Sequence, residues 1–219
     1  MKNLQLIDRE LTYWNTEKLK FTHPLRQLFW ECTLNCNLSC LHCGSDCKKE
    51  IKTNEMPLEH FLPVLDEIRL HQPTIKTMVY TIGGEPLVRK DLLECGRIIT
   101  EKGFYWGTVT NGHLLEQSLM KEMMKSGLRS ISVDIDGTKD DHNWLRNNSS
   151  SFDRAYNALI CIQNTPKLVW DVITCVNRRN FSRLNDIKQM LIDAGAKRWR
   201  CFTITPMGRG KENDELILT

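Results

Sequence analysis

Runs of β-forming residues alternate with amphipathic helical segments along most of this chain, and the alternation limits the folds that it can adopt. The six predicted strands cover 25–30, 77–82, 104–110, 130–135, 168–176 and 199–204, and the five predicted helices cover 57–71, 91–102, 115–126, 152–164 and 184–194. Three helices are followed by a glycine cap, at Gly103, Gly127 and Gly195, with a strand close behind. Such βα units predict a parallel sheet with right-handed connections, which either winds doubly or curls into a barrel.

Both ends of the chain are predicted to lie outside this repeat. Residues 1–24 form an N-terminal extension, in which apolar residues among charges indicate a weak amphipathic helix over 4–19 that packs on the main domain. Residues 25–210 hold the βα units, and residues 211–219 form a C-terminal tail. Six units are two short of a closed eight-fold barrel, and the chain ends without a helix after the sixth strand.

Composition and charge narrow the class of protein. The chain is 41% hydrophobic and 26% charged, as a soluble globular domain is, and its net charge of +3 is too small to favour nucleic acid or an anionic membrane as a partner. We find neither an apolar run of about 18 residues nor the apolar core of a signal peptide, so a cytoplasmic location is expected. Disulfides are then not expected among the nine cysteines. Four scattered cysteines are predicted to be small buried hydrophobes: Cys95, Cys161, Cys175 and Cys201.

The other five cysteines gather between Cys32 and Cys47, and three of them, Cys36, Cys40 and Cys43, have the spacing C-x3-C-x2-C. Three thiolates are an awkward set for structural zinc, which takes four protein ligands. They suit a cubane iron–sulfur cluster, in which each thiolate holds one iron and the fourth iron stays open for chemistry. Cys32 is predicted to belong to the core of the first strand, and the role of Cys47 is left open.

Polar and glycine-rich residues follow the predicted strands where each one ends. In barrels and in open α/β sheets this edge is where ligands bind, so the sequence predicts one pocket with the cysteine loop at its rim. The strand-end residues are Gly83, Gly84 and Glu85 after the second strand, Asn111 and Gly112 after the third, Asp134 and Asp136 at the fourth, Asn177 after the fifth and Pro206 after the sixth.

Together these motifs resemble those of the radical S-adenosylmethionine (radical SAM) superfamily. C-x3-C-x2-C after the first strand is similar to the cluster motif of that family, and the sequence over 83–86, Gly-Gly-Glu-Pro, is similar to its second motif. The segments 110–112, 132–134 and 206–210 resemble the peptide- and protein-modifying branch, which often has a further SPASM or twitch domain with auxiliary clusters. The resemblance covers about 25–210 and implies an α/β fold that is a partial (β/α)6 TIM-type barrel.

The resemblance also implies cofactors and roles for single residues. Cys36, Cys40 and Cys43 would hold three irons of a [4Fe-4S] cluster, and the open iron would bind S-adenosylmethionine and supply an electron for its reductive cleavage to a 5′-deoxyadenosyl radical. That radical would abstract a hydrogen from the substrate. Contacts to S-adenosylmethionine are expected from His42 (adenine), Gly83, Gly84 and Glu85 (amino group), Ser132 and Asp134 (ribose or carboxylate, with Asp136 as a competitor) and Arg146 (carboxylate). Asn111 is expected to contact the same ligand.

The expected partners are a peptide or protein substrate and an external one-electron reductant such as flavodoxin or ferredoxin. No cysteine follows Cys201, so we do not expect the auxiliary-cluster domain of the branch in this sequence. Either the sequence is truncated, or it is a minimal enzyme whose open edge is covered by a partner. A radical enzyme acting on a small molecule, or as an activase, is the alternative within this class.

Two other functions remain open from the residues alone. A zinc-binding structural module could use the three cysteines with Cys47 or His42 as the fourth ligand. An iron–sulfur electron carrier could use Cys47 as the fourth cysteine. Neither alternative gives a purpose to the polar residues at the strand ends.

Overall fold

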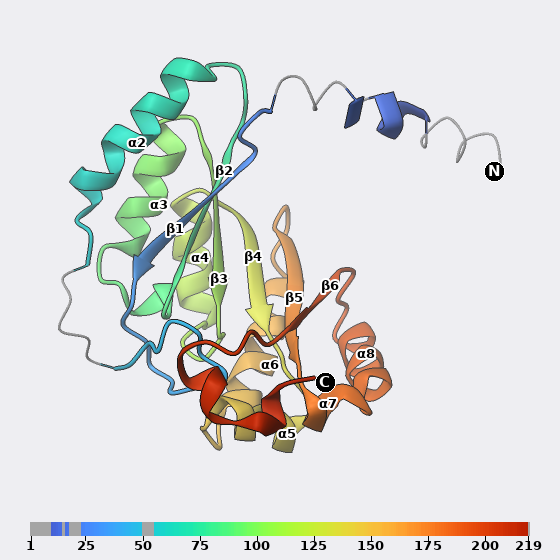
Figure 1. Ribbon diagram of the computed structural model, residues 1–219. Helices are drawn as coiled ribbons and strands as arrows, with labels where there is room; N and C mark the ends of the chain where they lie inside the picture. Colours follow the sequence, from blue (N-terminus) through green and yellow to red (C-terminus); the bar gives the residue numbers. More distant parts are fainter. Residues whose placement is uncertain (1–9, 15, 18–22, 50–54, 219) are drawn as a thin grey trace.

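The structure is a computed structural model that describes residues 10–14, 16–17, 23–49 and 55–218 (Figure 1). Six strands form one sheet in sequence order, and every neighbouring pair is parallel, which confirms the predicted sheet. The strands are β1 (Gln27–Thr33), β2 (Met78–Gly83), β3 (Tyr105–Thr110), β4 (Leu128–Asp134), β5 (Val169–Val176) and β6 (Trp199–Thr203).

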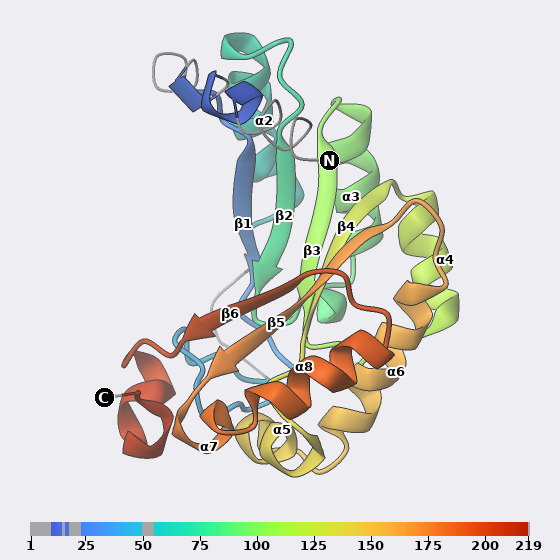
Figure 2. The same ribbon diagram turned by 90° about the vertical axis from the view of Figure 1, so that its right-hand side faces the viewer.

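Helices connect the strands on one side of the sheet. Figure 2 shows the strands turning progressively from β1 to β6, with α3, α4, α6 and α8 along the outer side. The helices are α2 (Leu58–His71), α3 (Leu92–Glu101), α4 (Gln117–Lys125), α5 (Lys139–Arg146), α6 (Ser151–Gln163), α7 (Arg178–Phe181) and α8 (Leu184–Asp193), with 3-10 turns η1 (Pro86–Val88), η2 (Gly208–Glu212) and η3 (Asp214–Leu216). The strands β1 and β6 are the two edges of a sheet that curls without closing.

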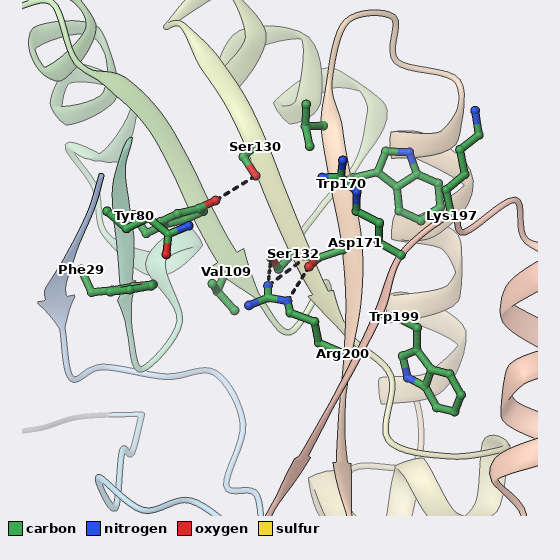
Figure 3. Close-up of a pocket in the computed structure, with 13 residues that line it drawn as sticks. Phe29, Tyr80, Val109, Ser130, Ser132, Trp170, Asp171, Lys197, Trp199 and Arg200 are labelled. Carbon is green, nitrogen blue, oxygen red and sulfur yellow. Dashed lines mark hydrogen bonds and ion pairs between the residues drawn. The ribbon is translucent and has the colours of Figure 1, made fainter. Parts of the chain in front are cut away.

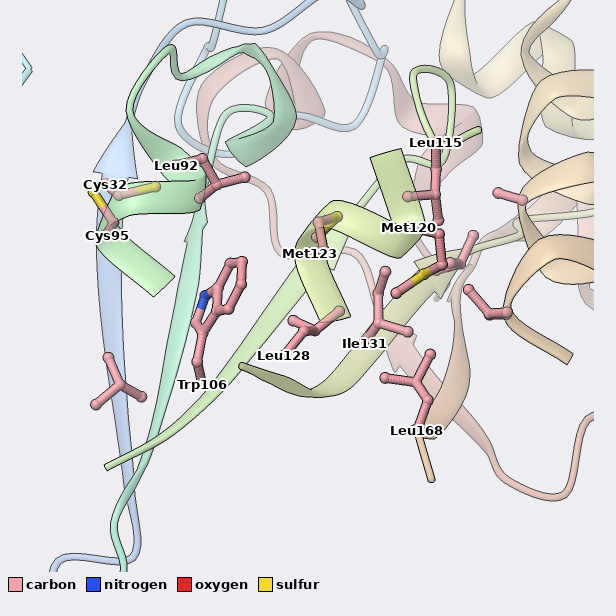
Figure 4. Close-up of a cluster of buried hydrophobic side chains, with 14 of the residues drawn as sticks. Cys32, Leu92, Cys95, Trp106, Leu115, Met120, Met123, Leu128, Ile131 and Leu168 are labelled. Atoms are coloured by element: carbon pink, nitrogen blue, oxygen red, sulfur yellow. The ribbon is translucent and has the colours of Figure 1, made fainter. Parts of the chain in front are cut away.

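The hydrophobic core lies between the sheet and these outer helices (Figure 4). Trp106 of β3 is fully buried there, and Met120 and Met123 of α4 pack into the same cluster. Gly96 of α3 makes room for the Trp106 ring, since a Cβ at Gly96 would lie 2.6 Å from Cδ2 of that ring. Helix packing on this side leaves the opposite side of the sheet free for cavities.

The structure describes the surroundings of three cysteines for which the sequence predicted burial. Cys32 and Cys95 are buried in the core, as expected. The prediction for Cys201 is wrong, because this residue is exposed on β6. That strand lies at the edge of the sheet, and most of its side chains are exposed. Helix α2 begins at Leu58 and continues through Pro63. Asn177 follows β5, and its side chain caps α7.

The N-terminal helix is only partly within the described residues. Residues 10–14 and 16–17 are helical, and the rest of the predicted 4–19 helix lies outside the described part of the chain. The predicted packing on the main domain is wrong for the side chains of Leu11 and Trp14, which are 64% and 70% exposed. In the described residues, no helix combines the length and the apolar character needed to cross a bilayer.

Candidate active site

The cysteine loop begins where β1 ends and folds back on itself. The Cys36 amide donates to the Lys48 carbonyl oxygen at 2.8 Å, which closes the loop at its base. Leu38 fills the inside, where it packs with Cys36, Cys40 and Cys47 in a small apolar cluster separate from the main core. The sequence therefore forms a compact loop whose cysteines are held by local packing.

One cavity of about 500 Å³ lies between this loop and the carboxyl ends of the strands. Three cysteines, Cys36, Cys40 and Cys43, line one part of it. Most of the predicted ligand-binding residues line it as well: His42, Gly83, Gly84, Asn111, Asp134 and Arg146. The pocket expected at the strand ends is therefore present, with the cysteine loop at its rim.

Each of the three sulfur atoms accepts an N–H group. The Leu38 amide donates to Cys36 Sγ at 3.5 Å, and the Cys47 amide donates to Cys43 Sγ at 3.3 Å. Arg146 Nη1 lies 3.8 Å from Cys40 Sγ. N–H donors around a thiolate stabilise its negative charge, and such groups around a metal ligand fix its orientation. The three sulfurs are thus prepared to be anionic ligands.

The acidity of the three thiols differs. Burial raises the pKa of Cys36 to about 11. A hydrogen bond with the Cys47 thiol lowers the pKa of Cys43 to about 6, with help from the Cys47 amide and the Arg209 charge. Thiolates are the form that binds metal, so Cys43 is the trio member that is most readily ionised.

The donor set suits a cluster better than a single ion. Among the described residues, no three His, Cys, Asp or Glu side chains converge closely enough to hold one metal ion. A cubane cluster spreads its thiolates over separate irons, so three cysteines around one cavity fit it without such convergence. The buried Nδ1 of His42 has no hydrogen-bond partner within the described structure, and a group bound in the cavity could supply one.

Gly83 and Gly84 pin the end of β2 to the start of the cysteine loop. The Gly84 amide donates to the Thr33 carbonyl oxygen at 2.7 Å. A Cβ at Gly84 would lie 2.7 Å from the carbonyl carbon of Asn35. The sequence predicted glycines at these two positions to let a ligand approach the backbone. The structure adds a second reason for glycine here, which is the close approach of two backbone segments.

We expect Gly84→Ala to destabilise the apo protein by about 1–3 kcal/mol, the usual cost of overpacking, because backbone rather than a flexible side chain meets the new methyl group. Urea unfolding measures it. Gly44→Ala is the control within the same loop region, since its Cβ would lie 3.9 Å from the nearest atom, Met207 Cβ. Equal stability of the two variants would contradict the assigned contact.

Glu85 lies behind the cavity rather than on its surface. Its carboxylate accepts hydrogen bonds from Thr110 Oγ1 at 2.7 Å, the Asn111 amide at 2.8 Å and the Leu87 amide at 3.1 Å. These bonds join the ends of β2 and β3 and hold Asn111 at the cavity. The family resemblance implied that Glu85 supports the ligand contact, and the structure shows that its side chain points into the protein, where it is fully buried.

Burial raises the pKa of Glu85 from 4.5 to about 7. The folded state then keeps a proton that the unfolded state loses, so Glu85 stabilises the fold below about pH 4.5 and loses this contribution as the pH rises to about 7. We expect the difference in unfolding free energy between the wild type and Glu85→Gln to shrink by about 2–3 kcal/mol from pH 5 to pH 8, at about 1.4 kcal/mol per pKa unit. Urea unfolding across this range measures it, and a difference that does not vary with pH would contradict the burial argument.

Arg146 is almost fully buried, and its guanidinium pairs with two carboxylates. Its Nη2 lies 2.6 Å from Asp136 Oδ2 and 3.2 Å from Asp134 Oδ2. Asp136 is fully buried and also accepts from the Cys175 amide at 2.8 Å. The neutral His142 Nδ1 accepts from the Asp136 amide at 3.1 Å, and burial lowers the His142 pKa to about 3. The α5 helix thus delivers Arg146 to the cavity through a buried polar network.

Ser132 faces an adjoining cavity of about 590 Å³ (Figure 3). Arg200 Nη2 donates to Ser132 Oγ at 2.8 Å, and the same guanidinium pairs with Asp171. On the other side, Phe29 and Tyr80 stack with ring centroids 5.3 Å apart. Arg200 and Phe29 line both cavities, so the space beside the cysteines continues into the interior of the curled sheet.

Two arginines at the cavity, Arg200 and Arg209, were not predicted from the sequence. Arg209 lines the cavity, and its Nε donates to the Cys40 carbonyl oxygen at 2.8 Å. The motif over 206–210 was read only as a mark of the branch. A contact between residues 169 positions apart leaves no local pattern that could have revealed it.

The comparisons with known proteins agree with this geometry. The family model described as Radical SAM superfamily matches residues 30–191. An AdoMet-dependent heme synthase of Methanosarcina barkeri is 29% identical over 90% of this chain and 56% of its own length. A mycofactocin maturase of Mycolicibacterium smegmatis is 28% identical over 84% of this chain and 46% of its own length. The chain thus spans about half the length of these curated relatives.

Solved structures share the fold. SuiB of Streptococcus suis, bound to S-adenosylmethionine, has a TM-score of 0.69 at 15% identity, covering 93% of this chain and 46% of that one. The protein anSMEcpe with bound AdoMet has a TM-score of 0.66 at 20% identity, covering 83% of this chain and 52% of that one. These likenesses confirm the partial-barrel α/β fold.

The cofactors of the matched family, a [4Fe-4S] cluster and S-adenosylmethionine, are those expected from the cysteine motif. The family model covers most of the chain, including all three cysteines and the strand ends that line the cavity. This protein belongs to the radical SAM superfamily of enzymes.

Proposed function

We propose that this chain binds a [4Fe-4S] cluster through Cys36, Cys40 and Cys43 and cleaves S-adenosylmethionine reductively in the adjoining cavity. Together, the two cofactors supply an electron and a 5′-deoxyadenosyl radical that takes a hydrogen atom from the substrate. The observation that supports this most is the single cavity that joins the three cysteines to the ends of β2, β3 and β4. An external reductant such as flavodoxin or ferredoxin would supply the electron, in the cytoplasm.

The residues around the cavity have separate tasks in this proposal. Gly83 and Gly84 present backbone groups to the amino end of S-adenosylmethionine, and the absence of a Cβ lets this segment lie close against the start of the cysteine loop. Asp134, whose side chain is 21% exposed, keeps acceptor capacity for a ribose hydroxyl, unlike the buried Asp136. His42 presents a neutral imidazole for the adenine, because burial lowers its pKa to about 4.

Three other residues would bind or position groups at the cavity. Arg146 keeps its charge beside Cys40 and could share its guanidinium between Asp134 and a ligand carboxylate. Glu85 would position Asn111 at the cavity by accepting a hydrogen bond from its backbone N–H. Ser132, which accepts from Arg200, would face the ribose side of the space shared by the two cavities. The chain's contribution is to bind, orient and keep water from the reacting groups.

Anaerobic reconstitution with iron and sulfide tests this function. We expect a brown protein with about four irons per chain, and 5′-deoxyadenosine formed from S-adenosylmethionine on addition of dithionite. A colourless zinc protein would support the structural-module alternative. A cluster that takes electrons but leaves S-adenosylmethionine intact would support the electron carrier.

A peptide or protein is the proposed substrate. Relatives named mycofactocin maturase and PqqA peptide cyclase support it, and so does the second cavity, which opens beside the exposed edge of β6 where an extended chain could enter. Relatives named AdoMet-dependent heme synthase and Fe-coproporphyrin III synthase make a porphyrin the second candidate.

Iron coproporphyrin III distinguishes these two substrate classes. If a peptide is the substrate, adding this porphyrin leaves the rate of 5′-deoxyadenosine formation at its uncoupled value. A porphyrin-dependent increase, accompanied by a change of the porphyrin mass, would overturn the peptide assignment. Both measurements use the reconstituted protein and S-adenosylmethionine, so the rate without porphyrin is the control for the rate with it.

A further inference from the structure

After β6 the chain turns back to the cysteine loop. Figure 1 shows this red segment beside the blue loop that follows β1, and hydrogen bonds join the two. The Arg209 amide donates to the Cys43 carbonyl oxygen at 3.0 Å. The last strand of the sheet thus leads directly to the loop that follows the first, across the open side of the curled sheet.

The Arg209 side chain joins several groups of the loop. Its Nε donates to the Cys40 carbonyl oxygen at 2.8 Å, and its Nη1 donates to the Cys47 carbonyl oxygen at 3.0 Å. The same Nη1 lies 2.6 Å from Asp46 Oδ1. The side chain is 18% exposed, so these bonds are largely shielded from water. One guanidinium therefore spans the loop from Cys40 to Cys47.

Gly208 makes this approach possible. Its φ is +50°, and a Cβ there would lie 2.5 Å from the Cys43 carbonyl oxygen and 2.8 Å from the Gly44 carbonyl carbon. A side chain at Gly208 would push the two segments apart. The glycine and the arginine therefore form one structural unit, which we name the loop clasp (Gly208 and Arg209).

We propose that Arg209 is a positioning residue that holds Cys40 and Cys43 in the geometry needed to keep the cluster. The inference rests on the proposed role of these cysteines as cluster ligands. A flexible ligand loop must lose conformational entropy on binding, and the clasp removes part of that cost by fixing the loop beforehand. Outer residues that orient metal ligands affect metal affinity about 10–100-fold.

The alternative is that Arg209 makes an ordinary surface ion pair with Asp46. Exposed ion pairs contribute little to stability, and Asp46 is 45% exposed on its side chain. The hydrogen bonds to the carbonyl oxygens of Cys40 and Cys47 distinguish the two roles of Arg209, because both bonds together need a planar guanidinium. A lysine keeps the charge and the pair with Asp46 but cannot reproduce both bonds.

The test compares Arg209→Gln, Arg209→Lys and Arg129→Gln, the last being an exposed arginine at the start of β4. Each protein is reconstituted anaerobically, and the rate of iron transfer to a chelator is followed together with the EPR spectrum of the reduced cluster. We expect Arg209→Gln to lose iron about tenfold faster and to show a broadened spectrum. Arg209→Lys should lie between it and the wild type, and Arg129→Gln should match the wild type.

Gly208→Ala gives a second route, because it pushes the clasp away and keeps the arginine. It should also release iron faster, even if Arg209→Gln does not fold. Wild-type release rates and spectra in both variants, or a lysine variant indistinguishable from the wild type, would overturn the inference. A wild-type protein that binds no cluster would instead contradict the proposed function, so the two failures are distinguishable.

Discussion

Replacing Cys36, Cys40 or Cys43 with alanine is expected to abolish cluster binding and the formation of 5′-deoxyadenosine. Each sulfur would hold its own iron, so two remaining thiolates cannot keep the cubane in place. We expect the loss of activity to reach the detection limit, while the unfolding temperature of the apo protein changes little, because these cysteines lie outside the main core. Iron content and product chromatography are the measurements.

Two further cysteines serve as controls. Cys201→Ala removes an exposed thiol on β6 and should leave both the cluster and the activity intact. Cys47→Ala tests the electron-carrier alternative, in which Cys47 is the fourth ligand. We expect this variant to retain a cluster that cleaves S-adenosylmethionine. Loss of the cluster on replacement of Cys47, together with inertness of the wild type toward S-adenosylmethionine, would contradict the three-ligand account.

Arg146→Met is expected to destabilise the apo protein by about 3–5 kcal/mol, the usual cost of leaving a buried charge without its partner. Asp136 is fully buried and would lose the guanidinium that lies 2.6 Å away. The loss should be smaller at pH 5 than at pH 8. Without Arg146, burial raises the Asp136 pKa in the folded state, so a rising pH then favours the unfolded state. Urea unfolding at both pH values measures the effect.

Two variants sharpen this experiment. Arg97→Met is the matched control, because Arg97 pairs with Glu94 and Glu101 on the surface of α3, with a side chain 50% exposed. It should lower the stability much less than Arg146→Met does, because exposed ion pairs contribute little. Adding Asp136→Asn to Arg146→Met should recover part of the lost stability, since the unpaired charge is removed. A double variant no more stable than Arg146→Met would contradict the ion-pair account.

Sequence patterns predicted well those elements that depend on residues close together in the chain. Gly103, Gly127 and Gly195 have positive φ values, as the predicted helix caps require. The apolar faces of α2, α4 and α6 follow the helical period, because each packs on the same sheet. The three cysteines were found because their spacing is local and their chemistry is specific.

The elements that were missed depend on contacts between distant residues. Helix α5 was not predicted, because the face it buries includes the polar His142 and Arg146 and offers no apolar stripe. The ligand contact expected of Arg146 stays a prediction, whereas its ion pairs with Asp134 and Asp136 were not predicted. Side-chain direction at Glu85 and the approach of Arg209 to Cys40 follow from tertiary packing, which local patterns do not encode.

The most direct test of the central claim is the yield of 5′-deoxyadenosine from the reconstituted, dithionite-reduced protein with S-adenosylmethionine, measured beside the Cys40→Ala variant. The account predicts product that depends on reductant and on cluster content in the wild type, and none in the variant. A wild-type protein with a full cluster and no 5′-deoxyadenosine, or equal product from the variant, would contradict it.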